Sequence, residues 1–422
     1  MRIPSDKPSF SHRGQIAALT RSVADATGNR DGIHDNEALP AGSLPQGKPT
    51  SRQPLLHRLT SHFAPGLSTR DERAALSAFV TEREAAWGAP TTRLSAEQVP
   101  WFEAFRTEKA AALVRFDRHP DEVTEGYVRA AGSVDGQAIE PRDVFWQRWA
   151  PTAPASGKVV VISPGFQETG RNFLEQVQLL NAQGHEVVVM DHQWAGYSRG
   201  ERGAIDRGYG VARDVAAVAA FAQTLVDARE GGGEVVLFGN SMGAGPGVLG
   251  ALALNDSGRL ELEGPQMPKG LNAVLQAPFL SLKRSVVNRG LEALSGVPVL
   301  NEVALPSSGL PILTRDPVAA TKLAQHVVLE GVVARPQAMG AAAADLEDLW
   351  GALRSGTGPQ GRVAIIHGDG DPLADIQGSR DLAHVLGAQG SLIELDNDSH
   401  VLSEEAGAQD RVLDALRWLD AP

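Results

Sequence analysis

The stretch EVVLFGNSMGAGPGVLGALAL, from Glu234 to Leu254, decides the predicted fold of this chain. Its start, EVVLF, contains the apolar run Val235 to Phe238 that is typical of a buried strand, and its last eleven residues are small or apolar ones that suit a helix. Between them, Gly239, Ser241 and Gly243 form a G-x-S-x-G pattern. Glycines at these positions permit a sharp strand-to-helix turn that exposes the serine hydroxyl. The stretch therefore predicts a reactive Ser241 at the carboxyl end of a strand.

A second G-x-S-x-G pattern occurs in AGYSRGERG, residues 195–203, around Ser198. The apolar run before it ends near Asp191, seven residues upstream, and the residues after it are charged and glycine-rich. No helical pattern follows. A strand, a turn and a helix therefore surround Ser241 but not Ser198, and Ser241 is the favoured nucleophile.

Short runs of Val, Ile and Leu alternate with helical segments from about residue 122 to the end of the chain. Such nearly continuous apolar strands predict a mostly parallel sheet that is covered by helices on both faces. The predicted fold class is therefore α/β. The expected strands are residues 144–150, 158–163, 185–191, 234–239, 272–277, 362–368 and 391–395.

The sequence divides into five predicted segments. Residues 1–66, rich in Ser, Pro and Gly, are expected to form a disordered or loosely attached tail, and residues 67–120 a helical extension with capping patterns. Residues 121–278 and 356–422 are expected to form the two parts of the α/β core. The interval 279–355 has no convincing strand, and so long an insertion predicts a cap over the substrate.

Composition excludes several classes of function. The formal net charge of −12 argues against a nucleic-acid partner, and the absence of cysteine excludes disulfides, thiolate metal sites and a cysteine nucleophile. No run approaches the roughly 18 apolar residues of a membrane helix, and the start MRIPSDKPSF has no apolar segment typical of a secretory signal. We therefore expect no integral membrane segment and, by default, a cytoplasmic location. The sequence leaves the oligomeric state open.

A reactive serine needs a base, and the histidine at position 400 is the favoured one. It lies in the polar loop of LIELDNDSHVLSEE, after the last predicted strand and before the terminal helix, from which it can reach back over the sheet edge. Four other histidines, His185, His192, His367 and His384, lie in or beside predicted strands and helices. We expect packing or hydrogen-bonding roles for them.

The acid that orients this base is expected to follow the preceding strand, in RVAIIHGDGDPLAD. Asp371 is favoured, Asp369 is the alternative, and Asp375 is expected to cap the next helix. The chain order Ser, Asp, His is typical of this kind of sheet.

Two backbone N–H groups are expected to receive the negative charge on the substrate oxygen. One belongs to Met242, the residue after the nucleophile. The other is expected at Phe166, because Gly165 in PGFQETG permits a tight turn after a central strand.

With these residues assigned, the chain from about residue 122 onward resembles the α/β-hydrolase family, in particular its branch of bacterial lysophospholipases, monoacylglycerol lipases and related serine hydrolases. The matching segments are SPGFQETGRNF, DHQWAGYSRG, GNSMG, HGDGD and DNDSH. In that branch the second segment is a structural turn, which accounts for Ser198. The chain departs from the family in having Pro164 where His is common, and residues 1–120 have no counterpart.

The resemblance implies a cap over an acyl-binding pocket, with Trp194 and Phe279 as substrate-binding residues, and a reaction that needs no metal or organic cofactor. The predicted function is hydrolysis of lipid-like single-acyl carboxylic esters through a Ser241, His400 and Asp371 triad and an acyl-enzyme. The predicted partner is thus a small-molecule or lipid ester. The alternatives are a carboxylesterase for small esters or polyesters, a proline-type aminopeptidase or amidase, and a ligand-binding protein on a hydrolase scaffold.

Overall fold

The computed structural model describes residues 118, 122–166, 168–193, 195–198, 203–206, 208–281, 305–306, 333–334, 336–402 and 407–421. All of them lie in the second of the two units into which the chain divides, Leu76–Pro422. The predicted tail, nearly all of the predicted helical extension and most of the predicted cap lie outside the described residues, so these predictions stay untested.

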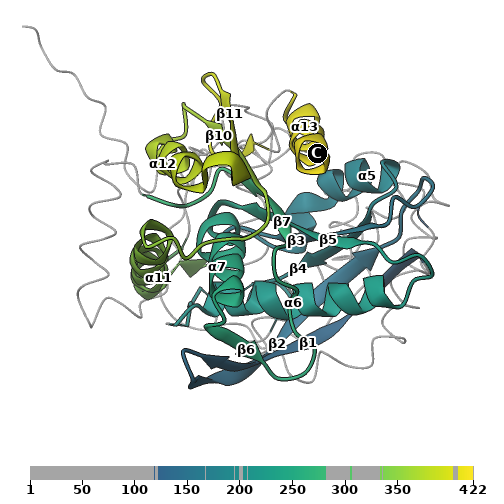
Figure 1. Ribbon diagram of the computed structural model, residues 1–422, viewed down its shortest axis with the longest axis horizontal. Helices are drawn as coiled ribbons and strands as arrows, with labels where there is room; N and C mark the ends of the chain where they lie inside the picture. The colour runs from purple at the N-terminus through teal and green to yellow at the C-terminus, as the bar shows by residue number, and fades with distance from the viewer. Residues whose placement is uncertain are drawn as a thin grey trace, which may run out of the picture. The chain divides into compact units, whose positions relative to one another are not determined.

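A sheet of nine strands is the centre of the described part of the chain, in the order β11-β10-β7-β5-β3-β4-β2-β1-β6 (Figure 1). The six neighbouring strands from β11 to β4 are parallel, and β2, β1 and β6 extend one edge in antiparallel fashion. The strands are β1 Val123–Val134, β2 Gln137–Trp149, β3 Lys158–Ser163, β4 Glu186–Met190, β5 Glu234–Asn240, β6 Leu260–Leu262, β7 Asn272–Gln276, β10 Val363–Gly368 and β11 Gly390–Leu395.

Helices cover both faces of this sheet. Side chains alternate along each strand, so that in β3 Val159 and Val161 belong to one buried apolar cluster and Val160 and Ile162 to the other. One cluster includes residues of α6 (Gly210–Asp227), η4 (Gly243–Leu249), α7 (Gly250–Asp256), α11 (Pro336–Arg354) and α12 (Ile376–Leu386). The other includes residues of α5 (Leu174–Ala182) and α13 (Ala408–Asp420). Burial on both faces explains the nearly continuous apolar runs of the inner parallel strands.

The smaller elements lie between these. They are the 3-10 helices η3 (Gly170–Phe173) and η6 (Gly387–Gln389) and a pair of two-residue strands, β8 (Leu305–Pro306) and β9 (Val333–Ala334). β8 and β9 lie in the interval where the sequence predicts no convincing strand, and at two residues each they are too short to leave a hydrophobic pattern. α11, which also lies in the interval predicted as the cap, contributes Ala338, Leu346 and Leu349 to the buried core. The last part of that interval thus packs against α7 and η4, the helices that follow Ser241.

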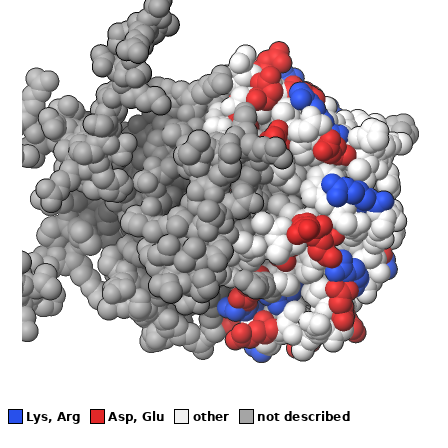
Figure 2. Space-filling view, turned by 90° about the vertical axis from the view of Figure 1, so that its left-hand side faces the viewer, with Lys and Arg blue, Asp and Glu red and all other residues white. Residues whose placement is uncertain are grey.

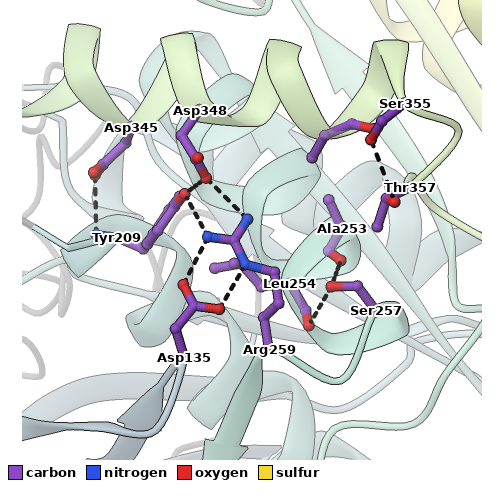
Figure 3. Close-up of polar contacts among 11 residues, drawn as sticks. Asp135, Tyr209, Ala253, Leu254, Ser257, Arg259, Asp345, Asp348, Ser355 and Thr357 are labelled. Carbon is purple, nitrogen blue, oxygen red and sulfur yellow. Dashed lines mark hydrogen bonds and ion pairs between the residues drawn. The ribbon is translucent and has the colours of Figure 1, made fainter.

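A polar network joins α11 to the start of α6 and to the antiparallel edge of the sheet (Figure 3). The backbone N–H of Tyr209 donates to Asp345 Oδ2 at 3.1 Å, and the Tyr209 hydroxyl contacts Asp348. Arg259 donates to Asp348 at 2.9 Å and to both carboxylate oxygens of Asp135 at 2.8 and 2.7 Å. These contacts link four segments that are distant in the sequence.

Where Figure 2 shows described residues, basic and acidic side chains are interspersed among uncharged ones. Ion pairs also join neighbouring elements, for example Arg380 of α12 with Glu394 of β11 at 2.6 Å. Within the described residues, the helices are either too short or too polar to cross a membrane.

Candidate active site

The elbow around Ser241 forms as the sequence predicts. β5 ends at Asn240, and Ser241 has a φ of 52°, a strained left-handed conformation for a serine, before the chain enters a helix. A Cβ on Gly239 would lie 2.5 Å from Ala244 Cα, and one on Gly243 would lie 2.1 Å from Pro164 O. Both glycines are therefore required by close backbone packing. The helix opens as the π-helix η4 rather than as a regular α-helix, and it contains a proline that cannot donate a backbone hydrogen bond.

Ser241, His400 and Asp371 form one continuous chain of hydrogen bonds. His400 Nε2 lies 2.8 Å from Ser241 Oγ, and His400 Nδ1 lies 2.6 Å from Asp371 Oδ2. The three side chains come from the end of β5, the loop after β11 and the loop after β10, and all are buried, with 7%, 3% and 1% exposure. Because an ionised carboxylate only accepts, Nδ1 of His400 carries the proton and Nε2 is free to accept one from Ser241.

The charges around His400 favour its protonated form. Burial alone disfavours the imidazolium, but the charge of Asp371, its hydrogen bond and the nearby Glu168 outweigh burial and raise the pKa of His400 above its ordinary value. Burial alone would likewise raise the pKa of Asp371. The charge of His400 and the hydrogen bonds from His367 and His400 instead hold the pKa of Asp371 well below its ordinary value. Asp371 is therefore an ionised carboxylate.

The two other aspartates of this loop make different contacts. Asp369 is exposed, and its Oδ1 accepts from the backbone N–H of Asn397 at 2.6 Å. Asp375 is the N-cap of α12 and accepts from the backbone N–H of Gln377 at 3.0 Å, as its position in the sequence predicts. Of the three candidates, only Asp371 has a hydrogen bond to His400 among those of the described residues.

The turn after β3 lies against the nucleophile and is closed by an acidic side chain that the sequence analysis does not single out. Glu168 Oε2 accepts from the backbone N–H of Gly165 at 2.6 Å and from Asn240 Nδ2 at 2.8 Å. Burial raises the pKa of Glu168, although the hydrogen bonds from Asn240 and Gly165 and the nearby His400 act in the opposite direction. The sequence shows an acid three residues after the glycine of this turn, but it does not specify that the side chain points back to the turn.

The remaining predicted site residues have different surroundings. Met242, directly after the nucleophile, is buried at 2% exposure, whereas Phe166 is only partly buried beside the core. Phe279 is buried in the core cluster, and its backbone N–H donates to Ser241 O at 2.9 Å. It thus braces the elbow through its backbone. Trp194 lies outside the described residues, so its predicted role is untested.

Ser198 occupies a structural turn. Its hydroxyl accepts from the backbone N–H of Phe145 at 2.7 Å and donates to the backbone carbonyl of Asp191. The side chain is buried and bridges the backbone of β2 to the residue that follows β4, the strand paired with β2. These contacts explain why a serine is present there without a nucleophilic role.

A second Ser, His and Asp array lies beneath the elbow. Ser163 Oγ is 3.0 Å from His192 Nε2, and His192 Nδ1 is 3.3 Å from Asp214 Oδ2. Ser163 is fully buried, and its hydroxyl also lies 3.2 Å from the backbone carbonyl of Gly243. This array supports the start of the helix after Ser241. His192 thus has a hydrogen-bonding role, as its place in the sequence predicts.

No group of three or more His, Asp or Glu side chains is arranged to hold a metal ion within the parts of the chain that the structure describes. The chemistry that the arrangement around Ser241 can perform is proton transfer from a serine hydroxyl to an imidazole, with a carboxylate behind it.

The parallel sheet, its helical cover and the strand–serine–helix elbow define the chain as an α/β-hydrolase. A family model described as serine aminopeptidase, S33, matches residues 154–406, and the chain belongs to this family. The predicted fold and the predicted enzyme class, a serine hydrolase, are thereby confirmed. No curated protein matches the chain in sequence.

Solved structures with the same fold include a soluble variant of monoglyceride lipase from Saccharomyces cerevisiae, with 17% identity, a TM-score of 0.54 and coverage of 68% of this chain and 94% of that chain. A lipase in its open form has 15% identity and a TM-score of 0.51, with coverage of 71% and 100%. A thermostable carboxyl esterase from Bacillus coagulans has 16% identity and a TM-score of 0.50, with coverage of 71% and 97%. At these identities the similarity shows a shared fold.

Proposed function

We propose that this chain hydrolyses carboxylic esters, in particular lipid-like esters with a single acyl chain, through a covalent acyl-enzyme on Ser241. The observation that carries the proposal is the hydrogen-bonded chain from Ser241 through His400 to Asp371, at 2.8 and 2.6 Å. The ester class is supported by structural neighbours whose names are monoglyceride lipase, lipase and carboxyl esterase.

In the proposed reaction, Ser241 Oγ attacks the ester carbonyl carbon while its proton passes to His400 Nε2. The backbone N–H groups of Met242 and Phe166 hold the oxygen that becomes negative. His400 then gives its proton to the leaving alcohol as the ester bond breaks. Water, deprotonated by His400, releases the acid and restores Ser241.

The family description favours a second candidate, cleavage of an amide at the amino end of a peptide. The same three side chains would serve this reaction, with an amine as the leaving group. The two candidates differ in the leaving group that His400 must protonate, so they are separated by substrate choice.

The test combines covalent labelling with a substrate series. A fluorophosphonate probe is expected to label Ser241, and Ser241→Ala is expected to abolish both labelling and turnover, whereas the matched variant Ser198→Ala keeps both. Nitrophenyl esters of increasing acyl length, tested beside aminoacyl nitroanilides, are expected to show turnover that rises with acyl length and little amide cleavage. An active Ser241→Ala variant would refute the mechanism, and preferential cleavage of the anilides would refute the ester assignment.

A further inference from the structure

Asp371 has a second histidine neighbour that the proposed reaction does not use. His367 lies in β10, and its Nε2 is 3.1 Å from Asp371 Oδ2, the same oxygen that lies 2.6 Å from His400 Nδ1. His367 and Asp371 have 0% and 1% exposure. Two imidazoles therefore share one carboxylate oxygen in a place that water does not reach.

The contacts of His367 determine which of its ring nitrogens carries the proton. The ionised carboxylate of Asp371 only accepts, so Nε2 of His367 is the donor. Nδ1 lies 2.7 Å from the hydroxyl oxygen of Ser379, a fully buried residue of α12. A neutral ring with its proton on Nε2 leaves Nδ1 to accept from this hydroxyl, so that both nitrogens are satisfied.

The other carboxylate oxygen of Asp371 is held by the backbone. Oδ1 accepts from the N–H groups of Leu373 and Ala374 at 2.7 and 2.9 Å. Together with the two histidines, these donors place hydrogen bonds on both oxygens of the carboxylate. The carboxylate is thus held in one orientation, and its charge is shared among several donors.

We propose that His367 is a positioning residue of this site, which holds the carboxylate oxygen that His400 uses and limits how strongly that oxygen attracts the proton on His400. The inference rests on the proposed function of Ser241 and His400. When His400 takes the serine proton, it becomes an imidazolium against Asp371. Because His367 also donates a hydrogen bond to Asp371 Oδ2, this oxygen stabilises the imidazolium less, and His400 gives its proton to the leaving group more readily. His367 keeps its own proton throughout.

Other charged groups face this pair of histidines. Glu168, on the turn after β3, acts on His400 through its charge, which raises the pKa of His400. Glu394 of β11 lies beside His367 in the strand register, and Arg380 of α12 pairs with that glutamate at 2.6 Å. All of these groups remain in the variants described below, so a change in pH dependence reports on His367.

The experiment measures the rate at which a fluorophosphonate labels Ser241 as a function of pH, so it needs no known substrate. In His367→Asn the shorter side chain places its amide group only where Nδ1 stands, so the hydrogen-bond donor to Asp371 is lost. In His367→Gln the amide nitrogen is as far from Cα as Nε2, so this donor is kept. His384→Asn makes the same change at an exposed histidine of α12 and is the matched control. Circular dichroism and thermal unfolding verify that each variant folds.

We expect the acidic limb of the labelling rate to move to higher pH in His367→Asn, by about 0.5 to 1 pH unit for the loss of one hydrogen bond to a carboxylate. It should stay in place in His367→Gln and His384→Asn. If the role of His367 were merely structural, its replacement by Asn would leave Asp371 less firmly held, and the acidic limb would move to lower pH. An unmoved or lowered limb in His367→Asn, or an equal movement in His367→Gln, would overturn the inference.

A second measurement uses the unmodified chain. Nitrogen-15 chemical shifts of the histidine rings distinguish a proton on Nε2 from one on Nδ1. We expect His367 to be protonated on Nε2 and His400 on Nδ1, and a proton confined to Nδ1 of His367 would overturn the inference without any variant. Failure of the unmodified chain to label at any pH would instead refute the proposed function, and this inference with it.

Discussion

Replacement of Gly165 by alanine tests whether the turn after β3 sets the position of the proposed oxyanion donor. A Cβ at this position would lie 2.6 Å from Glu168 Oε2 and 3.0 Å from Ser241 Cβ. The glutamate oxygen does not yield easily, because it holds the backbone N–H of Gly165 and the amide of Asn240. The φ of Gly165 is not positive, so the cost of the alanine is steric rather than conformational.

The size of the effect follows from these distances. To restore ordinary contact, the turn must move by about 0.4 to 0.8 Å, and a displacement of this order at a reacting centre lowers kcat by about 10- to 100-fold. The displacement acts on the transition state, so KM should change little. The extra methyl group should also lower the free energy of unfolding by about 1–3 kcal/mol.

Steady-state and burst kinetics with a nitrophenyl ester measure kcat, KM and the acylation rate, and urea unfolding measures stability. The matched control is Gly351→Ala at an exposed position of α11, where an added Cβ would have no neighbour within 4 Å. That variant should keep its kcat and gain up to about 1 kcal/mol of helix stability. If the kcat of Gly165→Ala stays within threefold of that of the unmodified chain, this turn does not position an oxyanion donor, and the prediction is wrong.

Three further predictions address Glu168, beside this site, and Ser198 and Asp345, elsewhere in the fold. Ser198→Ala should lower the free energy of unfolding by about 1–3 kcal/mol in urea unfolding, because two buried backbone groups lose their partner, while the specific rate of Ser241 labelling is unchanged. Glu168→Gln should move the acidic limb of kcat/KM to lower pH in a pH–rate profile, because the Glu168 charge raises the pKa of His400. Burial raises the pKa of Asp345 to about 7, so the folded chain binds the proton of this carboxyl group more tightly than the unfolded chain does. The stability that this bound proton contributes is therefore lost as pH rises from about 4 to 7. Asp345→Asn should therefore gain stability relative to the unmodified chain between pH 5 and pH 8 in urea unfolding.

The fold could be predicted from the sequence where burial leaves a pattern. The parallel strands β3, β4, β5, β7 and β10 are buried on both faces, so their Val, Ile and Leu runs stand out. β1, with the polar sequence VTEGYVRAAGSV, and β6, with three residues, have no such run and escaped prediction. The first half of β2 is likewise exposed, which is why the predicted strand begins at Val144 rather than at Gln137.

The proximity of His400 and Asp371 could be predicted for a different reason. Both follow neighbouring parallel strands, β11 and β10, and the loops at the carboxyl ends of such strands lie at the same edge of the sheet. The contacts of His367 and Glu168 depend instead on which way a side chain points from a strand end or a tight turn. Local sequence patterns do not specify such directions.

The two carboxylates near His400 differ in the donors that hold them, and this difference separates their effects. The donors that hold Asp371 include two histidines and two backbone N–H groups, and its charge is fixed over the pH range in which His400 titrates. Glu168 accepts two hydrogen bonds on a single oxygen, and burial raises its pKa. Removal of the Glu168 charge should lower the pKa of His400, whereas removal of the His367 donor should raise it. Opposite shifts of one pKa from these two substitutions would be hard to explain by a general loosening of the site, because loosening moves both in the same direction.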